Sequence, residues 1–245
     1  MKKIVMIGAS SGLGERMAAD FARVGCRVGL AARRTEPLEA IKALYPDRVA
    51  VKAIDVRSSD AVRNFYDLIE LIDGMDILLY ASGVGFQDPE LNDSKIRDIV
   101  DTNCTGFARI LAAAYRYYRE TANVKPGQIA AITSIAGTKG IGTAAAYSAS
   151  KRFQRNFIDA LEQLAYKQQV NVKFTDIRPG FIRTPFLNPD INYPMELSVN
   201  KAAPLIEVAV LRQKRCVYID SRWGVVNGLW SLVPQCLWKH VSIGI

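Results

Sequence analysis

The chain has 245 residues, of which 49% are apolar and 23% charged, with a formal net charge of +8 at pH 7. This length and composition exclude a disordered or low-complexity chain and favour one folded domain over two, so we expect a single domain spanning residues 1–245. The lysines and arginines are scattered, without a long basic run or a helix with one basic face, and no nucleic-acid partner is expected.

The first predicted elements are a strand over residues 4–7 and a helix that begins near Leu13, joined by a glycine-rich turn. Such a turn lets backbone N–H groups and the positive end of the helix approach a pyrophosphate. The spacing G-x-x-x-G-x-G differs from the usual dinucleotide fingerprint, so an ordinary strand-to-helix turn stays the alternative. The expected phosphate-binding residues are Gly8, Ser10, Ser11, Gly12, Leu13 and Gly14.

A second strand over residues 28–32 ends at Arg33 and Arg34. A dinucleotide fold that prefers the unphosphorylated cofactor usually has an acidic residue here, against the ribose 2′-hydroxyl. Two guanidinium groups favour a 2′-phosphate instead, because their planar forks bind it bidentately. The sequence therefore favours NADP(H) as cofactor, with NAD(H) as the second choice, and a solvated arginine pair is the alternative.

Strands and helices then alternate: strands over residues 48–54, 75–80 and 128–133, and helices over 59–72 and 93–120. This alternation predicts an α/β fold with a single doubly wound (Rossmann) parallel sheet of about seven strands and helices on both faces. The carboxyl ends of such strands face the ligand crevice. We expect five strand-end residues near the adenosine half of a cofactor: Asp55, Val56, Ala81, Ser82 and Gly83. For Asp55 a helix cap is the alternative.

Tyr147 and Lys151 are four residues apart and share one face if their segment is helical. Bringing the pKa of a phenol from about 10 to near 7 requires roughly 4 kcal/mol of phenolate stabilisation. A neighbouring ammonium in a desolvated cleft supplies such stabilisation, so Tyr147 would protonate a carbonyl oxygen or deprotonate an alcohol. Ser134, after the strand 128–133, would donate a hydrogen bond to the developing oxyanion. Two surface residues of a helix are the alternative for the Tyr–Lys pair.

These motifs, in this order, resemble the short-chain dehydrogenase/reductase family over nearly the whole chain. The pieces that match are the glycine-rich turn, Asp55-Val56, Ala81-Ser82-Gly83, Asn103, Ser134, Tyr147, Lys151 and the segment 178–184. The resemblance implies that Tyr147 is the general acid/base, that Lys151 also binds the nicotinamide ribose, and that Ser134 positions the substrate carbonyl.

The resemblance also implies that Asn103 holds a water that relays protons through Lys151; a helix-bending polar residue is the alternative. It implies that the segment after residue 178 cradles the nicotinamide, through Pro179, Gly180, Ile182 and Thr184. Two positions depart from the family pattern: Ile7 replaces a threonine, and Tyr80-Ala81-Ser82-Gly83 replaces an Asn-Asn-Ala-Gly turn. Neither change removes a chemical group of the site.

Residues 184–200 fall where the family carries its substrate lid. An apolar, proline-punctuated composition favours a bulky or apolar substrate, although a loop that only packs over the core is the alternative. The residues concerned are Phe186, Leu187, Pro189, Ile191, Tyr193, Pro194 and Met195. A helix over 199–212 and a strand over 215–220 follow.

The tail, residues 222–245, is apolar. Residues 223–238 carry no charge, and Val226, Leu229, Trp230, Val233 and Leu237 keep helical spacing. This stretch is shorter than the roughly 20 residues that span a bilayer. Three interpretations stay open: a helix on a membrane surface, a segment packed over the substrate cleft, or part of a subunit interface.

The four cysteines stand far apart without a C-x-x-C pair, so we expect no metal site and no disulfide framework. A cytoplasmic location is expected, with the tail as a possible peripheral contact to a membrane. The expected function is an enzyme, an NADP(H)-preferring oxidoreductase that transfers a hydride between a nicotinamide cofactor and a carbonyl or alcohol substrate. The resemblance implies a homodimer or homotetramer. The alternative is a non-catalytic NADPH-binding sensor or membrane-associated scaffold.

Overall fold

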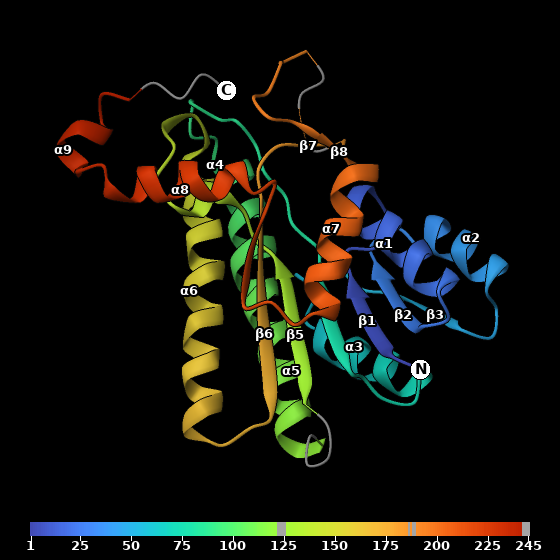
Figure 1. The fold of residues 1–245 in the computed structure, drawn as a ribbon. Coiled ribbons are helices and arrows are strands. Elements are labelled where there is room, and N and C mark those ends of the chain that lie inside the picture. Colours follow the sequence, from blue (N-terminus) through green and yellow to red (C-terminus); the bar gives the residue numbers. More distant parts are fainter. Residues whose placement is uncertain (122–125, 186, 188–189, 242–245) are drawn as a thin grey trace.

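The computed structural model describes residues 1–121, 126–185, 187 and 190–241. Its centre is a sheet of seven parallel strands in the order β3-β2-β1-β4-β5-β6-β9 (Figure 1). The strands are β1 (Lys3–Ile7), β2 (Arg27–Ala32), β3 (Val49–Ala53), β4 (Ile77–Tyr80), β5 (Gly127–Ile132), β6 (Val172–Pro179) and β9 (Cys216–Ile219). The strand order reverses between β1 and β4, which confirms the doubly wound sheet predicted from the sequence.

Helices cover both faces of the sheet (Figure 1). Side chains alternate along β1, so that Ile4 and Met6 face one layer of helices and Val5 and Ile7 the other. The first layer is α1 (Gly12–Arg23), α2 (Glu36–Leu44) and α7 (Val199–Leu211); the second is α3 (Ala61–Leu71), α5 (Phe107–Thr121) and α6 (Ala145–Lys167). The sheet is therefore buried on both sides, as expected for parallel strands.

The helix predicted over residues 93–120 is divided in three. It begins as α4 (Asp93–Ile99), widens into the π-helical segment η1 (Val100–Gly106) and continues as α5. At Gly106 a Cβ atom would lie 2.7 Å from Cγ2 of Val56, so the helix passes close to the chain beyond β3. Such π segments are rare and frequently mark functional sites.

Shorter elements surround the carboxyl ends of the strands. They are the 3₁₀ turns η2 (Ile135–Gly137) and η3 (Gly142–Ala144), the strand pair β7 (Ile182–Arg183) and β8 (Leu197–Ser198), and the tail helices α8 (Arg222–Leu232) and α9 (Gln235–Trp238). Within the described ranges, no helix is both long and apolar enough to cross a membrane.

The tail forms two helices, not one, and lies across the amino-terminal end of α6 (Figure 1). The face of α8 that packs on the body carries Trp223 and Asn227, and Trp230 is half-buried on the same side. Leu229 faces outward with a 61% exposed surface. The apolar spacing read from the sequence therefore predicted helical structure but not which residues face the domain. Residues 242–245 of the predicted tail lie outside the described residues.

Candidate active site

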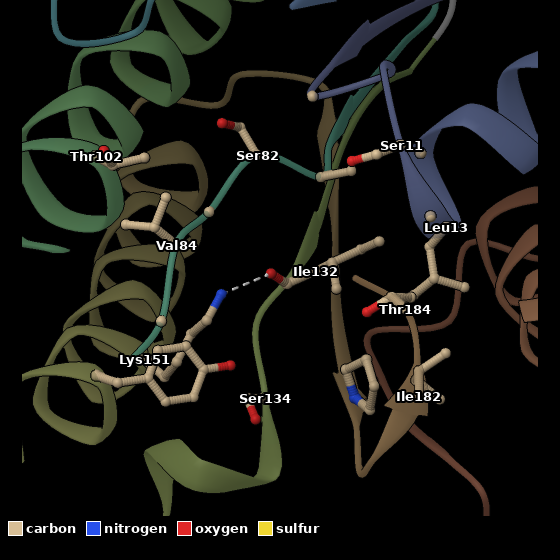
Figure 2. Close-up of a pocket in the computed structure, with 18 of the residues that line it drawn as sticks. Ser11, Leu13, Ser82, Val84, Thr102, Ile132, Ser134, Lys151, Ile182 and Thr184 are labelled. Atoms are coloured by element: carbon tan, nitrogen blue, oxygen red, sulfur yellow. Dashed lines mark hydrogen bonds between the residues drawn. The ribbon is translucent and has the colours of Figure 1, made fainter. Parts of the chain in front are cut away.

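A cavity of about 1070 Å³ lies at the carboxyl ends of the central strands. All the residues predicted to bind cofactor line it, as do Ser134, Tyr147 and Lys151; Asn103 does not. Figure 2 shows Ile182 and Thr184 on one wall, with Val84 and Lys151 on the other. The sheet topology explains this convergence, because strand ends on either side of the switch point meet at one edge.

The glycine-rich turn requires glycine at two positions for different reasons. Gly8 has φ +89°, and a Cβ there would lie 2.5 Å from the backbone nitrogen of Ser82. A Cβ at Gly14 would lie 2.1 Å from the carbonyl oxygen of Gly8, so α1 can start this close to β1 only without a side chain. The first backbone N–H groups of α1 are thus next to the cavity, where an anion can accept from them.

The far end of the cavity from Tyr147 contains two exposed arginines, Arg33 and Arg34. Asp55 lines the same end, where its carboxylate accepts from the Arg57 guanidinium at 2.9 Å, and this hydrogen bond holds the pKa of Asp55 below its usual value. Asp55 does not cap α3, which begins at Ala61. In the part of the chain that the structure describes, neither Arg33 nor Arg34 forms an ion pair, whereas Arg57 does.

The other end holds the Tyr147–Lys151 pair, one turn apart on α6. Lys151 is only 5% exposed, and its Nζ donates to the carbonyl oxygen of Ile132 at 3.3 Å (Figure 2) and to Oε1 of Gln154 at 3.0 Å. Nζ lies 5.7 Å from the centroid of the Tyr147 ring. Ser134, beyond the end of β5, hydrogen-bonds with Tyr147. The predicted catalytic side chains are therefore adjacent.

The pKa values of this pair differ from the sequence expectation. Desolvation in the cleft raises the pKa of Tyr147 to about 12, opposed by its hydrogen bond with Ser134. Burial lowers the pKa of Lys151 to about 8, with the Asp176 carboxylate acting against it. The expected lowering of the tyrosine pKa by Lys151 is not found, because the ammonium lies over the ring and desolvation of the hydroxyl dominates. At neutral pH Tyr147 carries its proton and most Lys151 side chains are charged.

Asn103 lies in η1 and is completely buried. Its side-chain oxygen accepts from the backbone nitrogen of Val84 at 2.9 Å, and its side-chain nitrogen donates to the carbonyl of Val84 and to Ser150. The side chain therefore joins the loop after β4 to α6. This position in a widened helical segment is compatible with the bending alternative, and the water relay implied by the resemblance stays a prediction.

The substrate end is walled by aromatic rings. Five of them, from three separate parts of the chain, form a continuous series: Tyr193, Phe181, Trp223, Trp230 and Trp238, with successive centroids 4.7, 5.6, 6.2 and 5.7 Å apart. Phe181, Tyr193 and Trp230 line the cavity itself. Of the three interpretations of the tail, packing over the cleft is thus the one seen in the structure.

Polar contacts fasten the tail to the loop before α6. The indole nitrogen of Trp238 donates to the carbonyl of Gly140 at 2.7 Å, and Lys139 donates to the carbonyl of Val233 at 2.7 Å. Of the predicted lid residues, Leu187 and Tyr193 line the cavity, while Phe186 and Pro189 lie outside the described residues.

Sequence reasoning missed several residues of the site. Phe86, Phe181 and Ile141 line the cavity at its substrate end, and Gln154 bonds Lys151. For Gln154 a signal existed, since a polar residue three positions after Lys151 falls on the same helical face. The loop residues carry no comparable pattern.

A parallel sheet with a glycine-rich turn at its switch point defines the doubly wound, nucleotide-binding class of α/β proteins. Within that class, the profile of the short chain dehydrogenase family matches residues 2–192, and the chain belongs to this family. It is accordingly an oxidoreductase of the kind that acts on alcohol or carbonyl groups.

Individual relatives agree with this assignment. The chain is 33% identical to an uncharacterised oxidoreductase from Myxococcus xanthus, over 97% of this chain and 95% of that one. It is 30% identical to a farnesol dehydrogenase from Aedes aegypti, over 78% of this chain and 81% of that protein. The crystal structure of a short chain dehydrogenase from Burkholderia cenocepacia in complex with NADP superposes with a TM-score of 0.82 at 19% identity, covering 99% of this chain and all of that one.

Proposed function

We propose that this protein is an NADP(H)-dependent reductase of bulky apolar carbonyl compounds, or a dehydrogenase of the corresponding alcohols. The observation that carries the proposal is that the glycine-rich turn, the segment 179–184 and the Ser134–Tyr147–Lys151 group line one cavity. The glycines fit a dinucleotide, because a Cβ at Gly8 or Gly14 would collide with backbone atoms and prevent α1 from beginning this close to β1, beside the cavity. The nicotinamide cofactor, when bound, supplies or accepts the hydride.

Side chains of this protein transfer the proton. The protonated hydroxyl of Tyr147 donates to the carbonyl oxygen of the substrate. Ser134, a hydrogen-bond partner of Tyr147, donates to the same oxygen as negative charge develops on it. Lys151 would hold the nicotinamide ribose and place a positive charge near the phenolate that remains. Asn103 acts here through the loop that it braces.

The preference for NADP(H) rests on Arg33 and Arg34 at the far end of the cavity. The dehydrogenase from Burkholderia cenocepacia was solved with NADP, and a second similar structure bears the description "ElxO with NADP bound", which supports this choice. The alternative, a non-catalytic sensor or scaffold, is not favoured, because the chain belongs to an oxidoreductase family and retains the whole catalytic group.

The first test is turnover. Purified protein mixed with NADPH and a panel of ketones and aldehydes, from short chains to long isoprenoid and ring compounds, is expected to consume NADPH and form the alcohol. The largest kcat/KM is expected for bulky apolar members. The sensor alternative would be favoured instead if calorimetry shows NADPH binding while no carbonyl of the panel is reduced and no corresponding alcohol is oxidised.

The substrate class follows from the walls of the cavity beyond Tyr147. Apolar and aromatic side chains such as Phe181, Tyr193 and Trp230 line the cavity, and Lys95, which also lines it, is paired with Asp88 at 3.2 Å. A charged substrate would lose its hydration without gaining a counter-charge. The Aedes aegypti relative is named for farnesol, an apolar alcohol, which supports the same class.

Replacing Trp230 by Ala is expected to raise KM for bulky apolar carbonyls about tenfold, because a large apolar contact is removed from the cavity wall. KM for a carbonyl of three or four carbons should change little. Leu229→Ala is the matched control, since the neighbouring side chain points outward from the same helix. An equal change of KM for small and bulky substrates would contradict the assignment of Trp230 to the substrate wall.

We also propose a homodimer that pairs α5 and α6 with their symmetry mates. Phe153 and Leu164 on α6 remain 40% and 38% exposed, and Phe157 lines a shallow groove with Arg109 and Arg116. Exposed apolar side chains along one helix, beside a groove shared with the next helix, are typical of a subunit contact.

A further inference from the structure

Gln154 is a completely buried polar side chain beside the catalytic pair. Its Oε1 accepts from Nζ of Lys151 at 3.0 Å, and its Nε2 donates to the main-chain carbonyl of Asn103 at 3.0 Å. An ammonium only donates and a carbonyl only accepts, so just one orientation of the carboxamide satisfies both contacts. The side chain therefore connects Lys151 on α6 to Asn103 in η1.

Lys151 depends on this contact because few other groups satisfy its charge. The second acceptor is the carbonyl of Ile132 at the longer distance of 3.3 Å. The titratable groups that face the ammonium are Asp176 on β6, Cys104 in η1 and Tyr147 on its own helix. The loop after β4 adds no charge, and it approaches so closely that a Cβ at Gly83 would lie 3.5 Å from Nζ.

The Asp176 carboxylate is already engaged elsewhere. It forms an ion pair with Arg178 at 2.6 Å and accepts from the hydroxyl of Thr133 at 2.6 Å. Its attraction for Lys151 is thus shared with a nearer cation. Without Gln154, the ammonium would keep one carbonyl as an acceptor in a desolvated site, where an unpaired donor is costly.

We propose that Gln154 is a positioning residue that fixes the Lys151 ammonium in the cavity by joining it to the carbonyl oxygen of Asn103. This inference rests on the proposed function for its catalytic meaning. A carboxamide, unlike water or a hydroxyl group, does not exchange protons readily. The bond through Gln154 consequently holds the charge of Lys151 in place but passes no proton between Lys151 and Asn103, which is the connection that the family resemblance assigns to a water.

The test compares Gln154→Met with Gln154→Glu. Lys151 loses its proton near pH 8 in the unchanged protein, so the ammonium is present below that pH and disappears above it. Methionine removes an acceptor of the charged form, and the titration of Lys151 should move about one pH unit lower. Glutamate supplies a carboxylate in the same place, and the titration should move higher. NMR of ¹⁵N-labelled lysine side chains measures both, with Lys151→Met assigning the signal.

NADPH binding provides a second measurement that needs no turnover. At pH 7.5 the Kd for NADPH, measured by calorimetry, should rise about tenfold in Gln154→Met. The hydrogen bond that fixes the Lys151 ammonium is lost, and this ammonium is the group that would hold the nicotinamide ribose. Gln128→Met is the matched control, because Gln128 is also buried and bonded through its carboxamide, to Thr175 and the carbonyl of Val210, away from the cavity. It should lower thermal stability but leave the titration of Lys151 and the Kd unchanged.

Each outcome decides the proposal. The proposal is overturned if Lys151 titrates in Gln154→Met at the same pH as in the unchanged protein, or if its titration moves in the same direction in both variants. If the methionine variant does not fold, an unmoved titration in Gln154→Glu overturns the proposal. The proposed function fails separately, through lack of turnover in the unchanged protein. A shifted titration in a protein without reductase activity would uphold the role of Gln154 toward Lys151 and reject the reaction.

Discussion

Replacing Tyr147 by Phe is expected to lower kcat for carbonyl reduction by about 10²- to 10⁴-fold, the range in which a positioned proton donor contributes to catalysis. The phenylalanine ring fills the same space beside Ser134 and below Lys151, so the cavity keeps its shape. Only the hydroxyl group, which carries the transferable proton, is removed. Steady-state rates with the best substrate of the panel provide the measurement, and the Kd for NADPH should stay within about threefold of its original value.

A matched control exists on the same helix. Tyr166 also lies on α6 but is 88% exposed and distant from the cavity, so Tyr166→Phe should leave kcat unchanged. Turnover that persists undiminished in Tyr147→Phe would remove this residue from the mechanism. A loss of NADPH binding in that variant would show that the hydroxyl group of Tyr147 holds the cofactor. Its role in proton transfer would then be judged from the pH dependence of the remaining rate.

The double substitution Arg33→Ala with Arg34→Ala is expected to raise the Kd for NADPH about 10- to 100-fold, while that for NADH changes little. Charge-assisted hydrogen bonds to the 2′-phosphate are lost, and only NADPH carries that group. Calorimetry with both cofactors gives the ratio of the two Kd values. Because both arginines are exposed, the difference between the cofactors should also shrink in high salt.

The control for this substitution must remove the same charge elsewhere. Lys167 and Lys173 are exposed at the end of the molecule opposite the cavity, at the last residue of α6 and near the start of β6. Replacing both by Ala changes the net charge equally and should leave the ratio unaltered. If the arginine variant likewise leaves the ratio unaltered, the arginines do not determine cofactor preference.

Hydrophobic patterning predicted most of the fold, because a buried parallel strand must be apolar along its length and a crossover helix apolar on one side. Once the strands were predicted, so were their carboxyl ends, and the residues at these ends line the cavity. The helix α2 was not among the predicted elements: it has nine residues and a proline near its start, and only Leu38 and Ile41 are buried. The π segment at Asn103 was also missed; the hydrogen bonds that its side chain forms there, with Val84 and Ser150, join residues that are distant in sequence.

The electrostatics of the site were the least predictable part. The spacing of Tyr147 and Lys151 correctly placed both on one helical face, but the pKa values depend on how far the fold desolvates each group. The same applies to Trp230, whose place in the cavity wall depends on how the tail folds back over the loop before α6. Composition indicates that such a tail must be buried somewhere, but it does not indicate against what.

The aromatic series at the substrate end gives the protein an optical property. The chain contains three tryptophans, and all of them belong to this series, next to the cavity that we assign to the cofactor. Their fluorescence therefore comes from one small region of the molecule. Reduced nicotinamide absorbs in the range in which tryptophan emits, so the native protein carries its own energy-transfer donor beside the site and needs no attached dye to follow NADPH as it enters.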